Sequence, residues 1–276
     1  MSVFASVIYG LISGVTEFLP VSSRGHQAIL RYLFGAETRI PLQELLVHIG
    51  VLFSVIVSCS EILHKLLREQ RIHSVHPHRK MRSAENKSYF DLRLLKTATV
   101  PLFIGLFIYF ATAKFEGNLL IVMAFWLINA VILFIADHMP RGNRESNTMS
   151  ALDGIAMGLV GVLSVLPGIS RTGTISSYAI ARGADDKNTA NWCVLLGIPA
   201  LIFAVLFDLV SFTAYGIGVH TITTAFGCLL SGVAAFIGGY CGISLFKLIL
   251  NHSGLSKFAY YSIGAALFSF AIYLIT

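Results

Sequence analysis

Charged residues are scarce in this chain of 276 residues, because Asp, Glu, Lys and Arg together make up 12% of it. Soluble domains carry about 25%. Hydrophobic residues make up 55% of the chain. This composition indicates a polytopic membrane protein rather than a soluble domain.

Other missing features exclude further classes. The chain has no Cys-x-x-Cys pair, and its cysteines lie singly in or beside apolar runs, so we expect buried packing residues rather than a disulfide framework or zinc site. These are Cys59, Cys193, Cys228 and Cys241. No basic patch is interleaved with aromatic residues, which argues against nucleic-acid binding. The N-terminus lacks a basic region and Glu17 interrupts its apolar run, so no cleaved signal peptide is expected.

Six apolar stretches approach the ~20 residues that a helix needs to cross a bilayer. The predicted spans are 42–60, 94–112, 119–136, 189–212, 221–247 and 258–275. Two further apolar stretches, 3–34 and 151–182, are each interrupted by a Leu-Pro pair. The runs of roughly 9–16 residues on either side are too short to span, and they predict re-entrant helical hairpins.

The basic residues predict the orientation. Most of the excess in the net charge of +6 lies in segment 61–93, which is therefore expected to be a cytoplasmic loop. Counting spans from there places 113–118 and 213–220 outside, and 137–150 and 248–257 inside. Four histidines of the loop lack a fixed scaffold, so a solvated connector is favoured over a metal site. They are His64, His73, His76 and His78.

An odd number of spans after the first hairpin inverts the second half of the chain. The predicted fold is an all-α polytopic membrane protein with two inverted-topology repeats, 1–136 and 151–276. Each repeat is a re-entrant helical hairpin plus three transmembrane helices. Hairpin 3–34 is expected to enter from outside and hairpin 151–182 from the cytoplasm, with their tips meeting near the midplane.

The two breaks have similar sequences. Leu-Pro-x-x-Ser-Arg occurs at 19–24 and again at 166–171. Coincidence in an apolar sequence is the alternative, but the two copies occupy topologically matched places. Two polar breaks of one design predict a single anionic-ligand site between the halves.

Charged groups at bilayer depth cost about 2.5–3.5 kcal/mol each on insertion scales, unless they pair or line a wet cavity. Glu17, Arg24 and Arg171 are such groups. A purely structural Glu–Arg pair would explain the charges but not the polar side chains at the same turns. Hydroxyl groups, guanidinium groups and helix N-termini together bind phosphate, and two such helix starts suit a diphosphate. The expected substrate-binding residues are Ser22, Arg24, Ser170, Arg171, Thr172 and Gly173.

Three residues of the first break are candidates for catalysis. Glu17 can hold a metal or act as a general base, Ser23 is a candidate nucleophile, and His26 can transfer protons. Ser22 is also a candidate helix cap, and a core histidine bonded to a carbonyl is the alternative for His26. Whether Ser23, His26 or a water is the nucleophile stays open.

The run at 16–26, Thr-Glu-Phe-Leu-Pro-Val-Ser-Ser-Arg-Gly-His, resembles the first signature of the undecaprenyl-diphosphate phosphatases of the bacitracin-resistance (BacA/UppP) family. The run at 166–173, Leu-Pro-Gly-Ile-Ser-Arg-Thr-Gly, resembles their second signature, and Glu44 with Gly50 resembles the family's next helix. The resemblance implies hydrolysis of undecaprenyl diphosphate to the monophosphate, which recycles the lipid carrier for peptidoglycan synthesis.

The resemblance also implies a multi-pass enzyme of the bacterial inner (plasma) membrane whose active site opens to the external side. It assigns a metal or catalytic role to Glu17, a nucleophile or substrate role to Ser23, a catalytic role to His26, and phosphate binding to Ser170 and Arg171. A divalent cation such as Mg²⁺ or Ca²⁺ is implied at Glu17. The expected partners are the polyprenyl diphosphate lipid and the bilayer, without nucleic acid, and a homodimer is a candidate assembly.

Three positions depart from the family pattern. Ser13 stands where an acidic or amide residue usually precedes Glu17, Arg24 replaces a small residue, and His48 stands where an amide is often found. Two alternatives therefore stay open. One is a prenyl-phosphate flippase or transporter, and the other is a catalytically weak paralogue that binds the lipid diphosphate.

Overall fold

The computed structural model describes residues 1–35, 39–75, 87–216, 219 and 221–275, and this part of the chain is almost entirely helical. Six of its helical stretches are long and apolar enough to cross a membrane, which confirms the number of predicted spans. They are α3 (Pro41–Ser58), α5 (Lys87–Thr112), α6 (Leu119–Asp137), the pair α9 (Asp186–Leu195) and α10 (Gly197–Tyr215), α11 (Ile222–Ser253) and α12 (Ser256–Ile275). The structure is thus that of an all-α polytopic membrane protein.

Both predicted breaks are present. The first lies between α1 (Val3–Phe18) and α2 (Ser23–Leu33), and the second follows α7 (Ala151–Val162) and the 3₁₀ turn η3 (Leu163–Val165) and precedes α8 (Arg171–Ala181). Leu19 and Leu166, which precede the prolines, are extended, because a proline disfavours the α conformation of the residue before it.

Each restarting helix is capped by a serine hydroxyl. Ser22 Oγ accepts from Gly25 N at 3.3 Å, and Ser170 Oγ accepts from Gly173 N at 3.2 Å. The predicted alternative of Ser22 as a helix cap is confirmed. The cap falls one residue earlier in the first copy of the motif than in the second, so the two breaks are similar but not superimposable in register.

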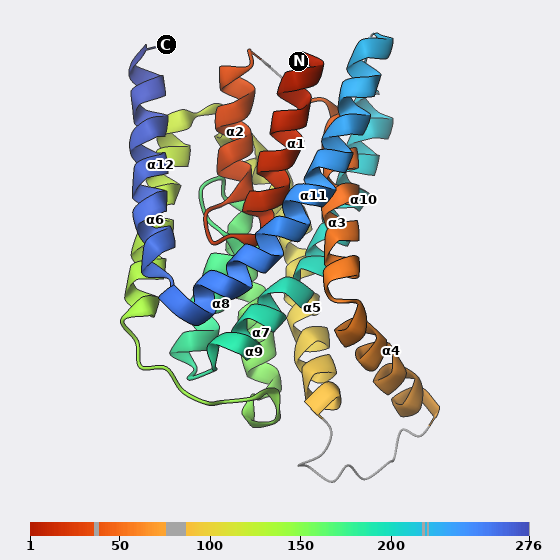
Figure 1. Cartoon of the computed structure of the whole chain (residues 1–276), viewed down its shortest axis with the longest axis vertical. Helices are drawn as coiled ribbons and strands as arrows, with labels where there is room; N and C mark the ends of the chain where they lie inside the picture. Colours follow the sequence, from red (N-terminus) through yellow and green to blue (C-terminus); the bar gives the residue numbers. More distant parts are fainter. Residues whose placement is uncertain (36–38, 76–86, 217–218, 220, 276) are drawn as a thin grey trace.

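Figure 1 places the two chain ends at one end of the molecule and α4 (Ser60–Val75) at the other. The connection 138–150 and the turn between α11 and α12 lie towards the end that carries α4. The segments predicted to share a side therefore do so. Part of segment 61–93 is not a loop, because α4 occupies 60–75 and α5 begins at Lys87. His64 is exposed on α4, while His76 and His78 lie outside the described residues.

Helix α11 is longer than predicted and crosses the molecule diagonally in Figure 1. Its 32 residues extend about 48 Å, more than the ~30 Å of a bilayer core, so a span of this length has to tilt. It packs on α1 through small residues. A Cβ on Gly10 would lie 2.0 Å from Ser231 O, and one on Gly14 would lie 2.2 Å from Ala235 O. This close approach fixes α1, and with it Glu17 at its end.

Three of the four cysteines are buried as predicted, and Cys241 is not. Cys241 lies on α11 next to Tyr240, whose side chain is also exposed. The prediction was wrong there because an apolar neighbourhood in a membrane helix is compatible with a lipid-facing position as well as with the interior.

Candidate active site

The two helix breaks are in direct contact. Gly168 N donates to Ser22 Oγ at 2.9 Å, and Ser170 Oγ donates to the carbonyl of Leu19 at 3.1 Å. Residues about 150 positions apart therefore form one polar centre, as the repeated motif predicted. The convergence explains how two interrupted helices satisfy backbone groups that would otherwise be unpaired in an apolar environment.

Helix α6 supplies two further residues that hold the breaks together. Asn129 donates from Nδ2 to the carbonyl of Pro20 at 3.0 Å and accepts at Oδ1 from Ser170 N at 3.0 Å. Trp126 donates from Nε1 to the carbonyl of Val21 at 2.8 Å. The sequence reasoning missed both. An amide inside an apolar span was the available signal, because buried polar groups in membranes need partners.

Ser22 is the one described residue other than glycine with a positive φ, at +65°. This conformation is uncommon for a residue with a side chain. It lets Ser22 Oγ accept hydrogen bonds from Gly25 N and from Gly168 N. The strained residue therefore lies where the two breaks meet, as strained residues at functional sites often do.

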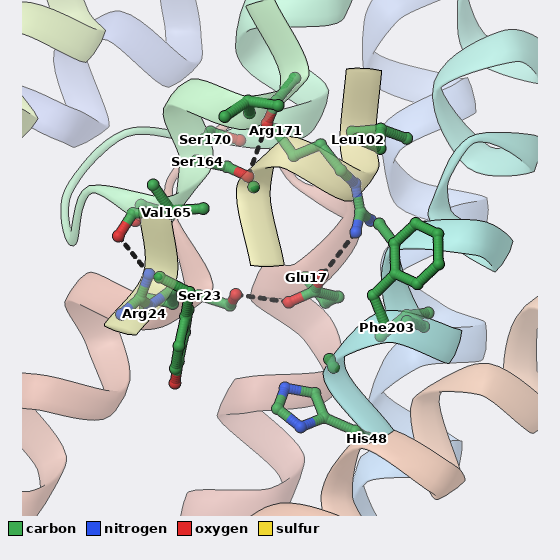
Figure 2. A pocket seen from close by; sticks show the side chains of 18 of the residues that line it. Glu17, Ser23, Arg24, His48, Leu102, Ser164, Val165, Ser170, Arg171 and Phe203 are labelled. Atoms are coloured by element: carbon green, nitrogen blue, oxygen red, sulfur yellow. Dashed lines mark hydrogen bonds and ion pairs between the residues drawn. The ribbon is translucent and has the colours of Figure 1, made fainter. Parts of the chain in front are cut away.

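The charged centre consists of Glu17, Ser23 and Arg171 (Figure 2). Arg171 Nη1 lies 3.0 Å from Glu17 Oε1, and Ser23 Oγ donates to Glu17 Oε2. The guanidinium is buried, yet its Nε and Nη2 atoms have no hydrogen-bond partner in the described part of the chain. A buried cation with two unpaired N–H donors is costly unless a ligand completes it. The geometry provides for an anion beside Glu17 and Ser23.

A cavity of about 140 Å³ opens at this centre. Its polar wall comes from both breaks and includes Glu17, Ser22, Ser23, Arg24, Ser170 and Arg171. Its other wall is apolar and is formed largely by α5, α7 and α10, with Leu102, Val162, Leu201, Phe203 and Phe207 among its residues. A cavity that is charged on one side and apolar on the other suits an amphiphile with an anionic head.

Arg24 lines the cavity but is occupied by protein groups. Its Nε donates to Glu116 Oε1 at 2.7 Å, its Nη2 also binds Glu116, and its Nη1 donates to the carbonyl of Val165. The guanidinium lies 4.1 Å from the ring centre of Tyr109. Arg24 thus connects the first break to η1 (Ala113–Gly117) and to the second break.

Glu116 is the centre of a buried ion-pair network. Arg31 and Arg39 bind it together with Arg24, and Arg31 Nη1 also lies 3.4 Å from Glu44 Oε1. Burial alone would raise the pKa of Glu116, but the three guanidinium groups hold it well below its usual range. Glu116 is therefore ionised and neutralises part of the positive charge beside the cavity.

His26 lies apart from the cavity. Its Nδ1 is 2.7 Å from the carbonyl of Ser22, and its Nε2 is 2.7 Å from the hydroxyl of Tyr261 on α12. Because a carbonyl only accepts, Nδ1 carries the proton and Nε2 accepts from Tyr261. The ring also meets Trp126 edge to face at 5.3 Å. This arrangement matches the alternative of a histidine bonded to a carbonyl.

The structure therefore brings together most, but not all, of the predicted site residues. Glu17, Ser22, Ser23, Arg24, Ser170 and Arg171 line the cavity. Thr172 is buried beside it, with Oγ1 3.0 Å from Ser170 Oγ, and Gly173 contributes its N–H to the Ser170 cap. No group of three or more His, Cys, Asp or Glu side chains that could hold a metal ion occurs within the described ranges.

Comparison with known proteins identifies consistent relatives. The sequence model of the family described as "Bacitracin resistance protein BacA" matches residues 6–268. The undecaprenyl-diphosphatase of Alkaliphilus metalliredigens is 31% identical over 95% of this chain and 95% of its own length. Those of Carboxydothermus hydrogenoformans and Thermosipho africanus are 29% and 28% identical, over 95% and 96% of this chain and 94% and 98% of their own lengths.

Proposed function

Because the chain belongs to the BacA family of bacitracin resistance proteins, we propose that it is an undecaprenyl-diphosphatase of the membrane. It hydrolyses undecaprenyl diphosphate to undecaprenyl phosphate and phosphate, and so recycles the lipid carrier for cell-wall synthesis. The relatives are named for hydrolysis, so the flippase or transporter alternative is not favoured. The observation that carries the proposal is the pair of N–H groups on buried Arg171 that find no partner among the described residues, beside Glu17 and Ser23.

The diphosphate head binds at the polar wall of the cavity. Arg171 offers Nε and Nη2, which together can hold two phosphate oxygens in the planar geometry that guanidinium groups favour. The N-termini of α2 and α8 both begin at this wall, and their free N–H groups favour negative charge. The apolar wall then takes the first isoprenoid units of the lipid.

The reaction begins at Ser23. Its hydroxyl already donates to Glu17, so Glu17 can accept the proton as Ser23 Oγ attacks the terminal phosphorus; a water is the alternative nucleophile. The bond to the bridging oxygen breaks, and undecaprenyl phosphate leaves. Arg171 stabilises the charge that develops on the phosphoryl oxygens. Where Ser23 attacks first, a water then hydrolyses the phosphoserine, and Glu17 returns the proton to Ser23 Oγ.

A divalent cation fits this site only with the help of the substrate. Glu17 is a single carboxylate, and Ser13, four residues earlier on α1, carries a buried hydroxyl that has no hydrogen-bond partner in the described part of the chain. Mg²⁺ is commonly held by one or two carboxylates together with substrate phosphates. We therefore expect Glu17 and the diphosphate to hold Mg²⁺ or Ca²⁺, which would neutralise phosphate charge when bound.

The finer architecture is part of the same proposal. The two broken helix pairs are re-entrant hairpins of an inverted repeat, an interpretation that the matched prolines and serine caps support. The protein lies in the bacterial inner membrane with its site open to the external side. Support comes from Arg24, which lines the cavity and binds Glu116 in the segment predicted outside. The homodimer remains a prediction.

Phosphate release from undecaprenyl diphosphate by the purified protein tests the function. We expect release by the wild type, loss with Glu17→Ala, and a decrease when EDTA removes divalent cations. Transport of the lipid into vesicles without phosphate release would instead support a flippase. Bacitracin protection that survives both Glu17→Ala and His26→Ala would support the catalytically weak binding paralogue.

A further inference from the structure

A histidine and an aspartate on two different spans form a pair inside the cavity. His48 is on α3 and Asp208 is on α10, and His48 Nδ1 lies 2.5 Å from Asp208 Oδ2. Asp208 is 2% exposed, and the side chain of His48 is 16% exposed. Both residues line the cavity that holds Glu17, Ser23 and Arg171. In Figure 2 the imidazole of His48 lies towards Glu17.

The partner of Nδ1 decides what Nε2 can do. A carboxylate that accepts from Nδ1–H fixes the ring in one tautomer and orientation, and it stabilises the ring when a second proton is bound. In the neutral ring, Nε2 of His48 carries a lone pair, and none of the hydrogen bonds in the described part of the structure uses that atom. A base with this geometry, in a cavity beside a nucleophile, is the usual arrangement for proton transfer.

His26 differs from His48 in the contacts of its ring nitrogens and in its place relative to the cavity. Its two ring nitrogens are bound to Ser22 and Tyr261, and it is not among the residues that line the cavity. The resemblance of the sequence to the family favoured His26, whereas the contacts favour His48.

We propose that His48 is the group that accepts a proton during hydrolysis, and that Asp208 is its positioning residue. The inference rests on the proposed function, because hydrolysis consumes a water whether that water attacks the lipid diphosphate or a phosphorylated Ser23. One proton of the water moves to Nε2 of His48 as the water oxygen bonds to phosphorus. The bond from phosphorus to the leaving oxygen breaks, and the proton departs with the phosphate product.

The charges around His48 are consistent with this role. Asp208 faces it from α10, Glu17 from α1, and Glu44 precedes it by one turn on α3. On the far side of Glu17, Arg171 keeps that carboxylate paired. An imidazolium formed during the reaction is therefore surrounded mainly by carboxylates, which favours it electrostatically.

The test compares six variants of the purified, full-length protein, four at histidines and two at Asp208, in phosphate release from undecaprenyl diphosphate. His48→Gln removes the base but keeps an amide that can donate to Asp208, so folding is preserved. His138→Gln makes the same change at an exposed position whose ring binds the carbonyl of Phe134 and which is not among the residues that line the cavity. His26→Gln tests the competing assignment. His48→Ala is assayed with and without added imidazole.

We expect His48→Gln to lower kcat by about 10²–10⁴-fold, the usual contribution of a general base, with KM within threefold of the wild-type value. His138→Gln should match the wild type, and imidazole should partly restore His48→Ala. Asp208→Asn should lower kcat and Asp208→Glu should recover much of it, because only a carboxylate holds the required tautomer. A purely structural pair would not respond to imidazole.

A decrease in kcat below 100-fold for His48→Gln, or a loss in His48→Ala that imidazole does not relieve, overturns the inference. A large loss in His26→Gln with an active His48→Gln would assign proton transfer to His26 instead. If the wild type releases no phosphate, the proposed function is wrong and the inference falls with it. If the wild type and His48→Gln are both active, only the inference fails.

Discussion

Arg171 offers the sharpest test of how the cavity binds its substrate. One of its terminal nitrogens, Nη1, is 3.0 Å from Glu17 Oε1, while Nε and Nη2 have no partner among the described residues. If the two free donors bind phosphate oxygens, Arg171→Ala removes two charge-assisted hydrogen bonds. Each is worth about 1.5–3 kcal/mol, so the loss of transition-state stabilisation is about 3–6 kcal/mol. This corresponds to roughly 10²–10⁴-fold in kcat/KM.

Arg171→Lys separates charge from geometry. Lysine keeps a cation near Glu17, so the carboxylate is not left unpaired, but it cannot present two parallel N–H donors. We expect it to recover part of the activity that Arg171→Ala loses. The C-cap of the same helix, Arg182, provides the control, because its side chain is 46% exposed and binds Asp153 instead of lining the cavity. Arg182→Ala should stay within threefold of the wild type.

The assay is initial-rate phosphate release in detergent, with thermal unfolding of each variant measured in parallel. A kcat/KM for Arg171→Ala within tenfold of the wild type would refute the role of the free donors. Equal losses in Arg171→Ala and Arg182→Ala would also refute it, because they would point to a general effect on the fold of α8. Full activity in Arg171→Lys would show that charge alone is sufficient.

Three other predictions concern stability, topology and the metal. Glu116→Gln should destabilise the protein at pH 7 by about 3–5 kcal/mol, the usual cost of breaking a buried ion pair. Because the folded-state pKa of Glu116 is lowered, this stabilisation is present above the ordinary carboxyl pKa and declines as the pH falls below it. A difference in unfolding temperature between the wild type and Glu116→Gln that stays constant with pH would contradict the network. In a background that lacks Cys241, a cysteine at exposed Lys114 should react with an impermeant thiol reagent added outside, and a cysteine at Arg141 should react only from inside. The reverse pattern would overturn the predicted orientation. Ser13→Glu should raise the affinity for Mg²⁺, measured from the metal dependence of phosphate release, and a folded but inactive variant would speak against a second ligand position.

Features that depend on local sequence were predictable. Runs of apolar residues identified the spans, and the two Leu-Pro pairs identified the breaks, because a proline constrains its own neighbours. The α4 helix was not predicted, since a polar and basic composition is compatible with a loop or with a helix. The C-terminal end of α11 was also missed, because a tilted helix can extend beyond the length that spans a bilayer.

Partners that are distant in sequence were not predictable from one chain. Nothing in the sequence indicated that Arg24 binds Glu116 or that His48 meets Asp208. The amide of Asn129 in an apolar span indicated that it needs partners, but not that those partners are the two breaks. These contacts depend on how the helices are placed relative to one another. The direction in which His26 points from α2 could be worked out from the sequence only once the start of that helix was known.

The helical period of roughly 100° per residue gives the direction of each side chain around the helix axis. Ser23, Arg24 and Gln27 of α2 line the cavity, and their directions around the helix lie within about 100° of one another. His26 is three residues after Ser23 and is therefore rotated roughly 110° from the centre of that face. The same count places His48 one turn after Glu44, on the side of α3 that turns towards the interior. Helix geometry thus explains why a histidine within the first signature contacts α12, while a histidine from another helix reaches the cavity.

The two arginines of the repeated motif show how a symmetric sequence yields an asymmetric site. Arg24 has its guanidinium nitrogens bound by Glu116 and the carbonyl of Val165, whereas Arg171 retains two donors that no described residue accepts. The difference arises because η1 supplies a carboxylate to the first break, and the described contacts of the second break give Arg171 only Glu17. One arginine therefore stabilises the contact between the breaks, and the other remains available for the diphosphate. A site with both arginines fully paired would have no guanidinium donor left for an anion, so the asymmetry favours binding of the diphosphate at the second break.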